Sequence, residues 1–511
     1  MTTNSYWVET QDLPSFESVS GNLSADVAVV GAGITGITAA MLLKRAGLKV
    51  VLLERDRCGG VDTSFTSGHL TQVTDLRLSP LVYRFGREVA QSVWEAGGAA
   101  LDVMNSNHAA AAEAAGFRWV PAFLFHSPEQ GLIATEDLRE DAEAARAMDI
   151  SVLWRDSAPP FGGPALQFPH QGLFHPRRYL NGLLASLPGD GCEVFEHSEV
   201  TQWDPSSETL SAGGHSIRVP WVVLATQTPQ IGSTPLPQAA ILESKLARYS
   251  TYVISGEVGH DVIPEGLYWD TAEPYHYLRV ERGPKANRLI LGGEDHKTGQ
   301  KSDPSEAYRC LSRLFHTWFP TGELHHRWSG QVVETNDGLP YIGLLAERLF
   351  VATGFSGNGL TFGTLAGLMA VDQILGVNNP WIDLFSPNRI HWKGGTWSFV
   401  RENKDYPFYL IRDRLTPAPS DSVTELPRGE GRLISVEGHK VAAYRSLDGE
   451  ITLCSPVCPH LKCIVRWNPT EQTWDCPCHG SRFQATGEVM SGPAQAPLQR
   501  LALESTGAAN R

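Results

Sequence analysis

Apolar runs and one helical repeat alternate at the start of the chain. Residues 26–30 form a short, mostly apolar run of the kind expected for a buried strand. Helical spacing follows over 37–46 and ends at Gly47, and residues 49–53 form a second apolar run. This order predicts a strand, a helix and a second strand.

The turn between the first strand and the helix is rich in glycine. Gly31 suits a tight turn, Gly33 lets the backbone approach a pyrophosphate, and Gly36 lets the helix pack closely on the strand. Glu54 ends the second strand, where an acid can accept hydrogen bonds from ribose hydroxyls. The alternative is a glycine turn without a ligand. The predicted dinucleotide contacts are Gly31, Gly33, Ile34, Thr35, Gly36, Glu54 and Arg55.

Two later apolar runs point to a flavin. Residues 221–226 and 348–354 read as strands, and the second enters a glycine-rich turn and an apolar helix. N–H groups at such a turn can face the N1–C2=O edge of a reduced flavin; the alternative is close helix packing through small residues. A second GxGxxG motif, which a pyridine-nucleotide-driven reductase would usually need, is absent from the sequence. The added contacts predicted for FAD are Ala225, Thr226, Gly354, Gly357, Asn358, Gly359, Leu360 and Thr361.

With these motifs, residues 20–385 resemble the D-amino-acid oxidase and glycine oxidase superfamily of flavoproteins. The resemblance implies a Rossmann-type FAD domain and a substrate domain on a mixed or antiparallel sheet. It also implies oxidation of a C–N bond in an amine or amino acid, by hydride transfer to flavin N5.

Five of the eight cysteines crowd into residues 454–478. Cys458 and His460 form a CxH motif, and Cys476 and His479 form a CxxH motif after 15 intervening residues. Two thiolates on one iron and two imidazoles on the other would hold a [2Fe-2S] cluster, and neutral histidine ligands raise its reduction potential. Zinc is the competing interpretation, because it also accepts two cysteines and two histidines.

The sequence around these ligands resembles the Rieske family over residues 425–506. That resemblance implies a disulfide between Cys463 and Cys478, as in the respiratory bc and photosynthetic bf proteins; the alternative is two reduced, buried thiols. Ser481 matches a serine that donates a hydrogen bond to a cluster sulfur, but the tyrosine donor of those proteins is replaced by Phe483. We therefore expect a potential above an ordinary ferredoxin and below the respiratory protein. Cys454 is expected to be a core cysteine.

The predicted fold is an α/β Rossmann-type FAD domain with an α+β substrate domain and a small all-β Rieske domain. The expected bounds are an N-terminal arm over 1–25, an FAD domain over 26–75, 166–240 and 325–380, a substrate domain over 76–165 and 241–324, a connector over 381–425, and a Rieske domain over 426–506. Residues 76–165 are expected to be mainly helical.

The substrate residues follow from weaker signals. His69 lies in a segment that, in the superfamily, runs from the ADP site toward the flavin ring, so an active-site role is expected beside the alternative of a structural histidine. Tyr275 and Tyr277 share one strand face with Arg279. Aromatic rings could hold a cationic amine, and Arg279 could pair with a carboxylate; such a stripe can also belong to the core. The candidate catalytic residues are His69, Tyr275 and Arg279, and no general base is assigned.

The net charge of −14 argues against nucleic acid or an anionic membrane surface as the main partner. No apolar run is long enough to span a bilayer and no signal peptide is evident, so the cytoplasm is the expected compartment. The partners expected are a small-molecule substrate and an external one-electron acceptor or donor, such as a ferredoxin or cytochrome.

Three functions stay open at this point. In the first, a substrate reduces FAD and electrons leave singly through the cluster. In the second, an external reductant feeds the cluster and FAD acts as a monooxygenase or reductase. In the third, the chain is a non-catalytic electron-transfer or redox-sensing protein. The whole layout, including the arm at Ser5–Trp7, resembles bacterial FAD-dependent oxidoreductases with a C-terminal Rieske domain, whose substrates vary.

Overall fold

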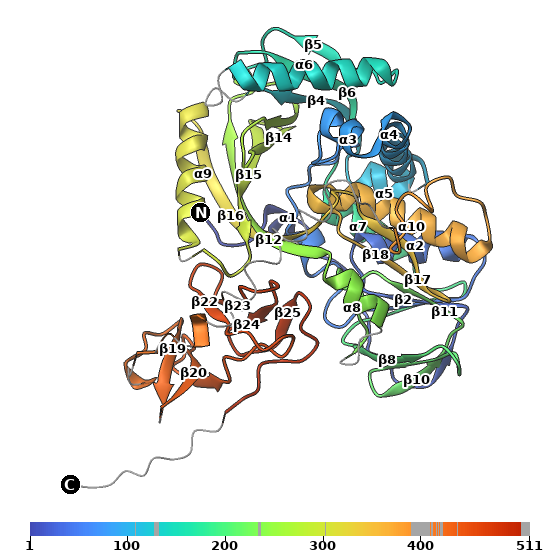
Figure 1. The fold of residues 1–511 in the computed structure, drawn as a ribbon, viewed down its shortest axis with the longest axis vertical. Helices are drawn as coiled ribbons and strands as arrows, with labels where there is room; N and C mark the ends of the chain where they lie inside the picture. The colour runs from blue at the N-terminus through green and yellow to red at the C-terminus, as the bar shows by residue number, and fades with distance from the viewer. Residues whose placement is uncertain are drawn as a thin grey trace. The chain divides into compact units, whose positions relative to one another are not determined.

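The computed structural model describes residues 1–107, 109–126, 132–232, 237–301, 303–389, 409, 412–414, 416, 418–419, 423–436 and 438–501. They form two compact units. The first contains residues 1–246, 251–295 and 307–395, and the second contains residues 247–250, 296–306 and 396–511. Figure 1 shows the ribbon by residue number.

A six-stranded sheet organises the first unit. Its strand order is β17-β18-β11-β2-β3-β7, and all neighbours are parallel except β17 and β18. The strands are β2 (Val27–Val30), β3 (Val50–Leu53), β7 (Cys192–Phe195), β11 (Trp221–Leu224), β17 (Tyr341–Ala346) and β18 (Leu349–Thr353). In β2 and β3 every residue is buried, as expected for parallel strands covered on both faces.

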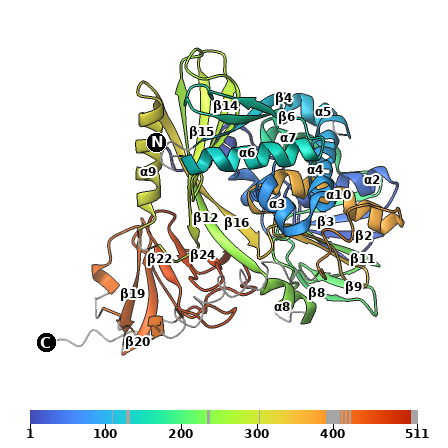
Figure 2. The same ribbon diagram turned by 45° about the horizontal axis from the view of Figure 1, so that its top comes forward.

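Helices α2 (Ile34–Arg45) and α10 (Gly359–Leu375) pack against each other in this unit, and α10 also contacts α4 (Arg87–Asp102). Figure 2 shows α2 and α10 beside strands β2 and β3. A small sheet of order β1-β10-β9-β8 is also present. Its strands are β1 (Leu23–Ser24), β8 (Val200–Asp204), β9 (Thr209–Ala212) and β10 (His215–Arg218).

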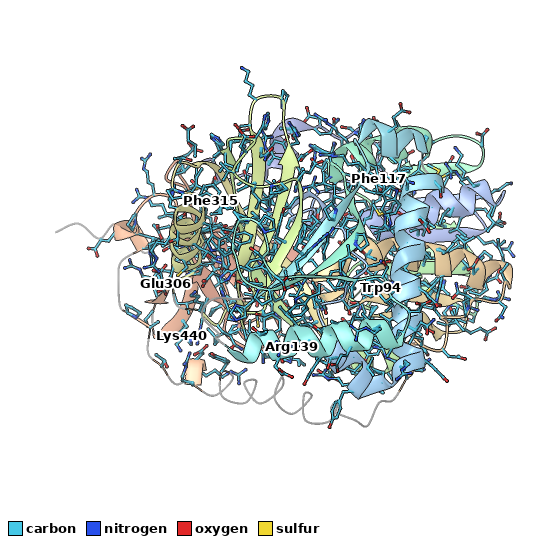
Figure 3. All side chains as sticks on the ribbon, turned by 90° about the horizontal axis from the view of Figure 1, so that it is seen from above. Trp94, Phe117, Arg139, Glu306, Phe315 and Lys440 are labelled. Atoms are coloured by element: carbon cyan, nitrogen blue, oxygen red, sulfur yellow. A yellow bond between two sulfur atoms is a disulfide. The ribbon has the colours of Figure 1, made fainter. Side chains whose placement is uncertain are left out.

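The larger sheet has eight strands in the order β16-β12-β15-β14-β13-β4-β6-β5. The strands are β4 (Arg118–Phe125), β5 (Leu153–Arg155), β6 (Ala165–Leu173), β12 (Leu246–Val258), β13 (Gly266–Asp270), β14 (Tyr277–Arg282), β15 (Asn287–Lys297) and β16 (Glu323–Thr335). Helix α9 (Ser305–Trp318) contributes Phe315, whose ring lies 5.5 Å from that of Phe319 in the core of this part (Figure 3).

The remaining helices place the segments between the sheets. Trp94 of α4 lies 5.8 Å, ring to ring, from Phe168 of β6, which joins the helical segment to the large sheet (Figure 3). The other helices are α1 (Tyr6–Thr10), α3 (Leu78–Phe85), α5 (Ala109–Ala114), α6 (Leu132–Ala147), α7 (Pro176–Ser186) and α8 (Pro237–Glu243).

Two expectations about this unit need adjustment. Residues 76–165 contain the predicted helices but also strands β4 and β5, which pair with β6 in the large sheet. Strands β6 and β16 extend to residues 173 and 335, so 166–173 and 325–335 lie in the substrate-domain sheet instead of the FAD domain.

The second unit contains two small antiparallel sheets. One has the order β19-β20-β21 and the other β22-β23-β24-β25. The strands are β19 (Glu430–Val436), β20 (His439–Arg445), β21 (Ile451–Cys454), β22 (Arg466–Asn468), β23 (Thr473–Asp475), β24 (Arg482–Gln484) and β25 (Val489–Ser491). This is the small all-β domain that the sequence predicts. Most of the expected connector, 381–425, lies outside the described residues.

No helix in the described part of the chain is both long enough and apolar enough to cross a membrane.

Candidate functional sites

Three predicted flavin-binding segments meet at one edge of the six-stranded sheet. Strands β18, β11 and β2 are parallel neighbours, so the loops at their carboxyl ends lie side by side. Gly31 follows β2 with φ of +96°, and a Cβ there would lie 2.6 Å from the carbonyl oxygen of Ala225. Thr353, at the end of β18, donates a hydrogen bond of 2.5 Å to the carbonyl of Gln227. This edge has the geometry of a dinucleotide site.

The glycines of the first turn have different tasks. A Cβ on Gly36 would lie 1.9 Å from the carbonyl oxygen of Gly31, so only glycine allows α2 to begin here. A Cβ on Gly33 would meet only Thr63 Oγ1, at 3.4 Å, which leaves the backbone open to a ligand. Gly33 gives helix α2 no side-chain cap; in the first turn the Ile34 N–H donates to Thr63 Oγ1 (3.2 Å), and the helix N-terminus is otherwise of the kind that binds a phosphate.

Glu54 lies beside this turn. Its Oε2 accepts a hydrogen bond from the Ala32 N–H (2.8 Å), and its Oε1 accepts one from the Asp56 N–H (3.0 Å). Each carboxylate oxygen has a further lone pair for a ribose hydroxyl. Burial raises the pKa of Glu54 above its usual value. Arg55 pairs with Asp56 at 3.2 Å, and its contact with the dinucleotide stays a prediction.

The third segment, after β18, contains glycines that pack on helix α2. Gly363 and Gly367 are packing glycines, because a Cβ on either would lie within 3.0 Å of α2 residues Thr35, Ile34 or Thr38. The turn before them is held by side chains: Asn358 donates to the Val73 carbonyl (2.8 Å) and Thr361 to the Thr71 carbonyl (2.7 Å).

Asp75 was not singled out from the sequence, yet it connects the glycine turn to the large sheet. Its Oδ2 accepts a hydrogen bond from the Gly357 N–H (2.5 Å), and its Oδ1 accepts one from the Tyr275 hydroxyl (3.0 Å). Burial raises the pKa of Asp75 although its side chain keeps accessible surface. Asp75 therefore combines close protein surroundings with an exposed side chain that a ligand could reach.

A second acid, Asp295 at the end of β15, completes this group. The Thr251 hydroxyl lies near enough to lower the pKa of the Asp295 carboxylate, and it is 2.8 Å from the Tyr277 hydroxyl. Asp295 Oδ1 is shielded from bulk solvent and has no hydrogen-bond partner among the described residues. Burial raises the pKa of Asp295 to about 7. A carboxyl with such a pKa can hold or release a proton near neutral pH.

In the second unit, the two predicted ligand motifs lie on loops of the same construction. The Cys458 N–H donates to the Cys463 carbonyl and the Cys476 N–H donates to the Ser481 carbonyl, both at 2.8 Å. The flanking residues pair across each loop in the same way, as 457 with 464 and 475 with 482.

The fifth residue of each loop has a left-handed backbone: φ is +64° at Lys462 and +72° at Gly480. Its N–H donates to the carbonyl of the loop's first cysteine at 3.0 Å in both cases. The two loops therefore share one backbone design, although the histidine is the third residue of the first loop and the fourth residue of the second.

Among the four predicted ligands, the two cysteines lie together and so do the two histidines. The Cys458 and Cys476 thiols are buried and near enough to share a hydrogen bond, and the rings of His460 and His479 are 4.9 Å apart. Burial, with His460 and Arg248 nearby, lowers the pKa of His479 to about 3, which keeps the imidazole neutral as iron requires. Two thiols facing two imidazoles fit a Rieske cluster.

The two spare cysteines of these loops form the predicted disulfide: Cys463 and Cys478 are joined with an S–S distance of 2.06 Å. Cys476 lies near this pair, but the disulfide sulfurs are not available as thiolate ligands. Cys454 is buried in β21, as expected of a core cysteine.

Comparison with known proteins agrees with both sites. Residues 26–373 match the family described as FAD dependent oxidoreductase (DAO), which is more than half of the chain. The chain belongs to this family. Residues 417–502 of the oxidoreductase match the Rieske [2Fe-2S] domain. The cofactors are therefore FAD and a [2Fe-2S] cluster, and zinc is set aside.

Relatives of the oxidoreductase support this assignment. The chain is 30% identical over 513 residues to YhfW of Bacillus subtilis, named as a Rieske 2Fe-2S iron-sulfur protein, which covers 98% of this chain and 97% of YhfW. It is 23% identical to gamma-glutamylputrescine oxidoreductase of Escherichia coli, covering 81% and 99%. The fold resembles glycine oxidase of Geobacillus kaustophilus, with a TM-score of 0.60, 20% identity, and coverage of 72% and 99%.

His69 of the oxidoreductase stands beside the aromatic residues of the large sheet. Its ring lies 5.6 Å from Trp269 and 6.2 Å from Tyr277, centroid to centroid. Burial, with Arg279 nearby, lowers the pKa of His69 to about 3. Its Nδ1 has no hydrogen-bond partner in the described part of the chain. The His69 imidazole is therefore neutral and packs beside aromatic rings. Its catalytic role stays a prediction.

Arg279 has different partners from the carboxylate expected for it. It is fully buried, and its guanidinium donates to the carbonyls of Gly68 and Phe174, both at 2.6 Å, and to Glu281 at 3.3 Å. It also stacks on Trp7 of the N-terminal arm, 5.0 Å from the ring centroid. We assign Arg279 a positioning role, because it holds the backbone next to His69.

Replacing Arg279 by methionine is expected to lower the free energy of unfolding of the first unit by about 3–5 kcal/mol, because two carbonyls and Glu281 would lose a buried charged partner. Thermal and denaturant unfolding followed by flavin fluorescence would measure this. Arg282→Met, on the exposed face of the same strand, is the control and should change stability by less than about 0.5 kcal/mol. Equal stability of the two variants would contradict the positioning role.

The Ser481 hydroxyl accepts a hydrogen bond from the Ala494 N–H (3.1 Å) and lies within hydrogen-bonding reach of the Cys458 sulfur. Its hydrogen bond to a cluster sulfur stays a prediction. Phe483 is fully buried in β24 and offers no hydroxyl. The prediction of one sulfur hydrogen bond fewer thus agrees with the local structure.

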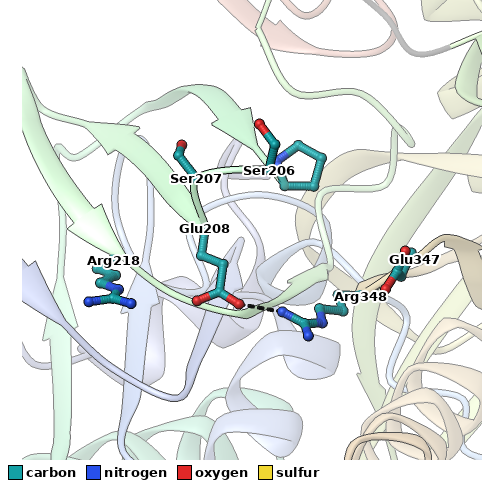
Figure 4. A pocket seen from close by; sticks show the side chains of 7 residues that line it. Ser206, Ser207, Glu208, Arg218, Glu347 and Arg348 are labelled. Atoms are coloured by element: carbon teal, nitrogen blue, oxygen red, sulfur yellow. Dashed lines mark hydrogen bonds and ion pairs between the residues drawn. The ribbon is translucent and has the colours of Figure 1, made fainter.

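A pocket away from these sites is lined by Pro205–Glu208, Arg218, Glu347 and Arg348 (Figure 4). It lies on the small sheet and the β17–β18 turn, and an ion pair between Glu208 and Arg348 closes one side. Because its charged groups pair with each other, we do not assign it to the chemistry.

Proposed function

We propose that the oxidoreductase oxidises the C–N bond of an amine, and that the electrons leave singly through the Rieske cluster to an external acceptor such as a cytochrome or ferredoxin. The observation that carries this proposal is the pair of acids, Asp75 and Asp295, beside the glycine turn and the hydroxyls of Tyr275 and Tyr277. The named amine oxidoreductase among the relatives adds support.

The charges of this group favour a cation over a carboxylate. Asp75 is hydrogen-bonded to Tyr275, and Asp295 shares a network with Thr251 and Tyr277. Two acids and two aromatic rings suit an ammonium group, through charge and cation–π attraction. Arg279, the residue expected to bind a carboxylate, instead donates hydrogen bonds to backbone carbonyls. We therefore favour amines over α-amino acids.

Asp295 is the group best suited to receive a proton. Its Oδ1 is shielded and without a partner in the described residues, and its pKa of about 7 lies near the operating pH. Above that pH the carboxylate would hold the substrate ammonium and take one of its protons. The neutral amine then carries the electron pair from which a carbon–nitrogen double bond forms.

When bound, FAD accepts the hydride from the carbon next to nitrogen, and the cluster passes the electrons on one at a time. The substrate ammonium thus loses one proton and one hydride, and the hydride carries both electrons. The product is an iminium ion, which water hydrolyses to a carbonyl compound and an ammonium ion. Two molecules of a one-electron acceptor restore the oxidised protein.

An anaerobic screen of paired compounds would test this proposal. Each amine is mixed with the holoprotein beside its α-carboxylated analogue, while flavin bleaching and the signal of the reduced cluster are recorded together. We expect amines to bleach the flavin and then reduce the cluster. Bleaching by the amino acids alone would reject the choice of substrate. Oxygen consumption that requires an added reductant would favour the reverse flow of electrons.

The pH dependence of flavin reduction should identify Asp295. Its pKa is raised to about 7, so the reactive carboxylate forms as pH rises, and the rate should increase through that range. Asp295→Asn should remove this increase of the rate with pH and slow flavin reduction by roughly 100-fold above pH 7. The groups that also act on Asp295 are Thr251, Asp75, His276 and Glu294. Glu294→Gln, one residue away, is the control: it should keep the increase with pH but move it to lower pH, because a charge that raises the Asp295 pKa is removed.

We keep the cytoplasm as the expected compartment. Six of the eight cysteines, including the two cluster ligands, are not in a disulfide. Free thiols are typical of a reducing environment. The Cys463–Cys478 pair is the exception that the Rieske fold itself accounts for.

A further inference from the structure

The second unit is not made of C-terminal residues alone. It includes residues 247–250, from strand β12, and residues 296–306, which follow the body of β15. These short segments are joined to each other: the Thr298 N–H donates to the Arg248 carbonyl (3.1 Å), and the hydroxyls of Ser250 and Thr298 are 3.0 Å apart. Within the unit they form one structural element, which we call the 248–300 support.

The support packs on the second cluster loop. A Cβ on Gly299 would lie 2.9 Å from the backbone of both Cys476 and Pro477, so glycine permits a backbone-to-backbone approach here. Gln300 donates a hydrogen bond to the Pro477 carbonyl (3.0 Å). The loop that carries two ligands is therefore held from outside the sequence of the Rieske domain.

Arg248 brings a charge to the same place. Its Nη1 donates to the carbonyl of His479, at 3.4 Å, and the residue is only 4% exposed. A guanidinium stays protonated at all ordinary pH values, and burial keeps its field from being screened by salt. The carbonyl it contacts belongs to one of the two histidine ligands.

We propose that Arg248 is a positioning residue of the iron-sulfur centre that also raises its reduction potential. Reduction adds one electron, and hence one negative charge, to the bound cluster. A fixed positive charge beside the His479 backbone stabilises that added charge. This effect opposes the lower reduction potential expected from Phe483, which lacks the tyrosine hydroxyl. The proposal does not depend on which substrate is oxidised.

The test is the midpoint potential of the cluster in the full-length holoprotein, measured by EPR during a redox titration. Arg248→Gln removes the charge but keeps an N–H donor, and we expect a shift to a more negative potential. Arg248→Lys keeps the charge and should stay close to the wild type. Arg500→Gln removes a surface charge of the same unit, paired with Glu488, and should have no effect.

A fully iron-loaded Arg248→Gln variant with the wild-type potential would overturn the proposal, and so would equal shifts in the Gln and Lys variants. If Arg248→Gln loses iron, Gln300→Lys decides the matter, because it adds a positive charge on the same loop contact. That variant should move the potential upward, and an unchanged potential with an unchanged EPR line shape would reject the electrostatic role.

Discussion

Cys476→Ser is expected to abolish the iron-sulfur centre while leaving the flavin in place. Serine offers a hard hydroxyl that is not ionised at neutral pH, so one iron would lose a thiolate ligand. Cys476 is fully enclosed by the domain core, which prevents water from replacing it without disturbing the loop. Iron and acid-labile sulfide should fall to background, and the EPR signal of the reduced cluster should disappear.

Cys454→Ser is the matched control. Cys454 is also buried in the same core, but it contacts the Thr486 carbonyl and belongs to neither ligand loop. This variant should keep iron, sulfide and signal. FAD content should be equal in both variants, and in Cys476→Ser a reducing substrate should still bleach the flavin without reducing cytochrome c. A full cluster in Cys476→Ser would show that the ligand assignment is wrong.

Gly36→Ala should remove FAD and destabilise the first unit. The new Cβ would lie 1.9 Å from the Gly31 carbonyl oxygen, and neither atom is on a flexible side chain. Helix α2 would have to move away from the turn that it forms with β2, at a cost of at least about 1–3 kcal/mol. Flavin content after purification and the unfolding temperature measure the two effects, and both should fall.

Gly33→Ala separates binding from folding at the same turn. Its Cβ would meet only Thr63 Oγ1, at 3.4 Å, so the apoprotein should unfold at the wild-type temperature. The methyl group would occupy the open backbone surface, so FAD affinity should still fall. Gly21→Ala, with no atom within 4 Å of its Cβ, should change neither quantity. Wild-type flavin content in Gly36→Ala would contradict this account of the turn.

The sequence by itself determined the two cofactor sites. The FAD turn is local: Gly31, Gly33 and Gly36 follow a strand and open a helix, and these positions set the backbone directly. The cluster loops are also local, since each places a cysteine, a histidine and a left-handed residue within six positions. Backbone conformations of this kind can be predicted from the sequence, because they depend on neighbouring residues and few tertiary contacts change them.

Only the tertiary structure decided what surrounds these sites. Tyr275 reaches Asp75 across 200 positions and Arg248 reaches His479 across 231, and no local pattern marks such partners. The strand alternation suggested that Tyr277 and Arg279 share a face. It could not show that the Arg279 guanidinium donates hydrogen bonds to the carbonyls of Gly68 and Phe174. These contacts depend on the register of the sheets and on how distant segments cross in the fold. They therefore cannot be predicted from any short stretch of the sequence.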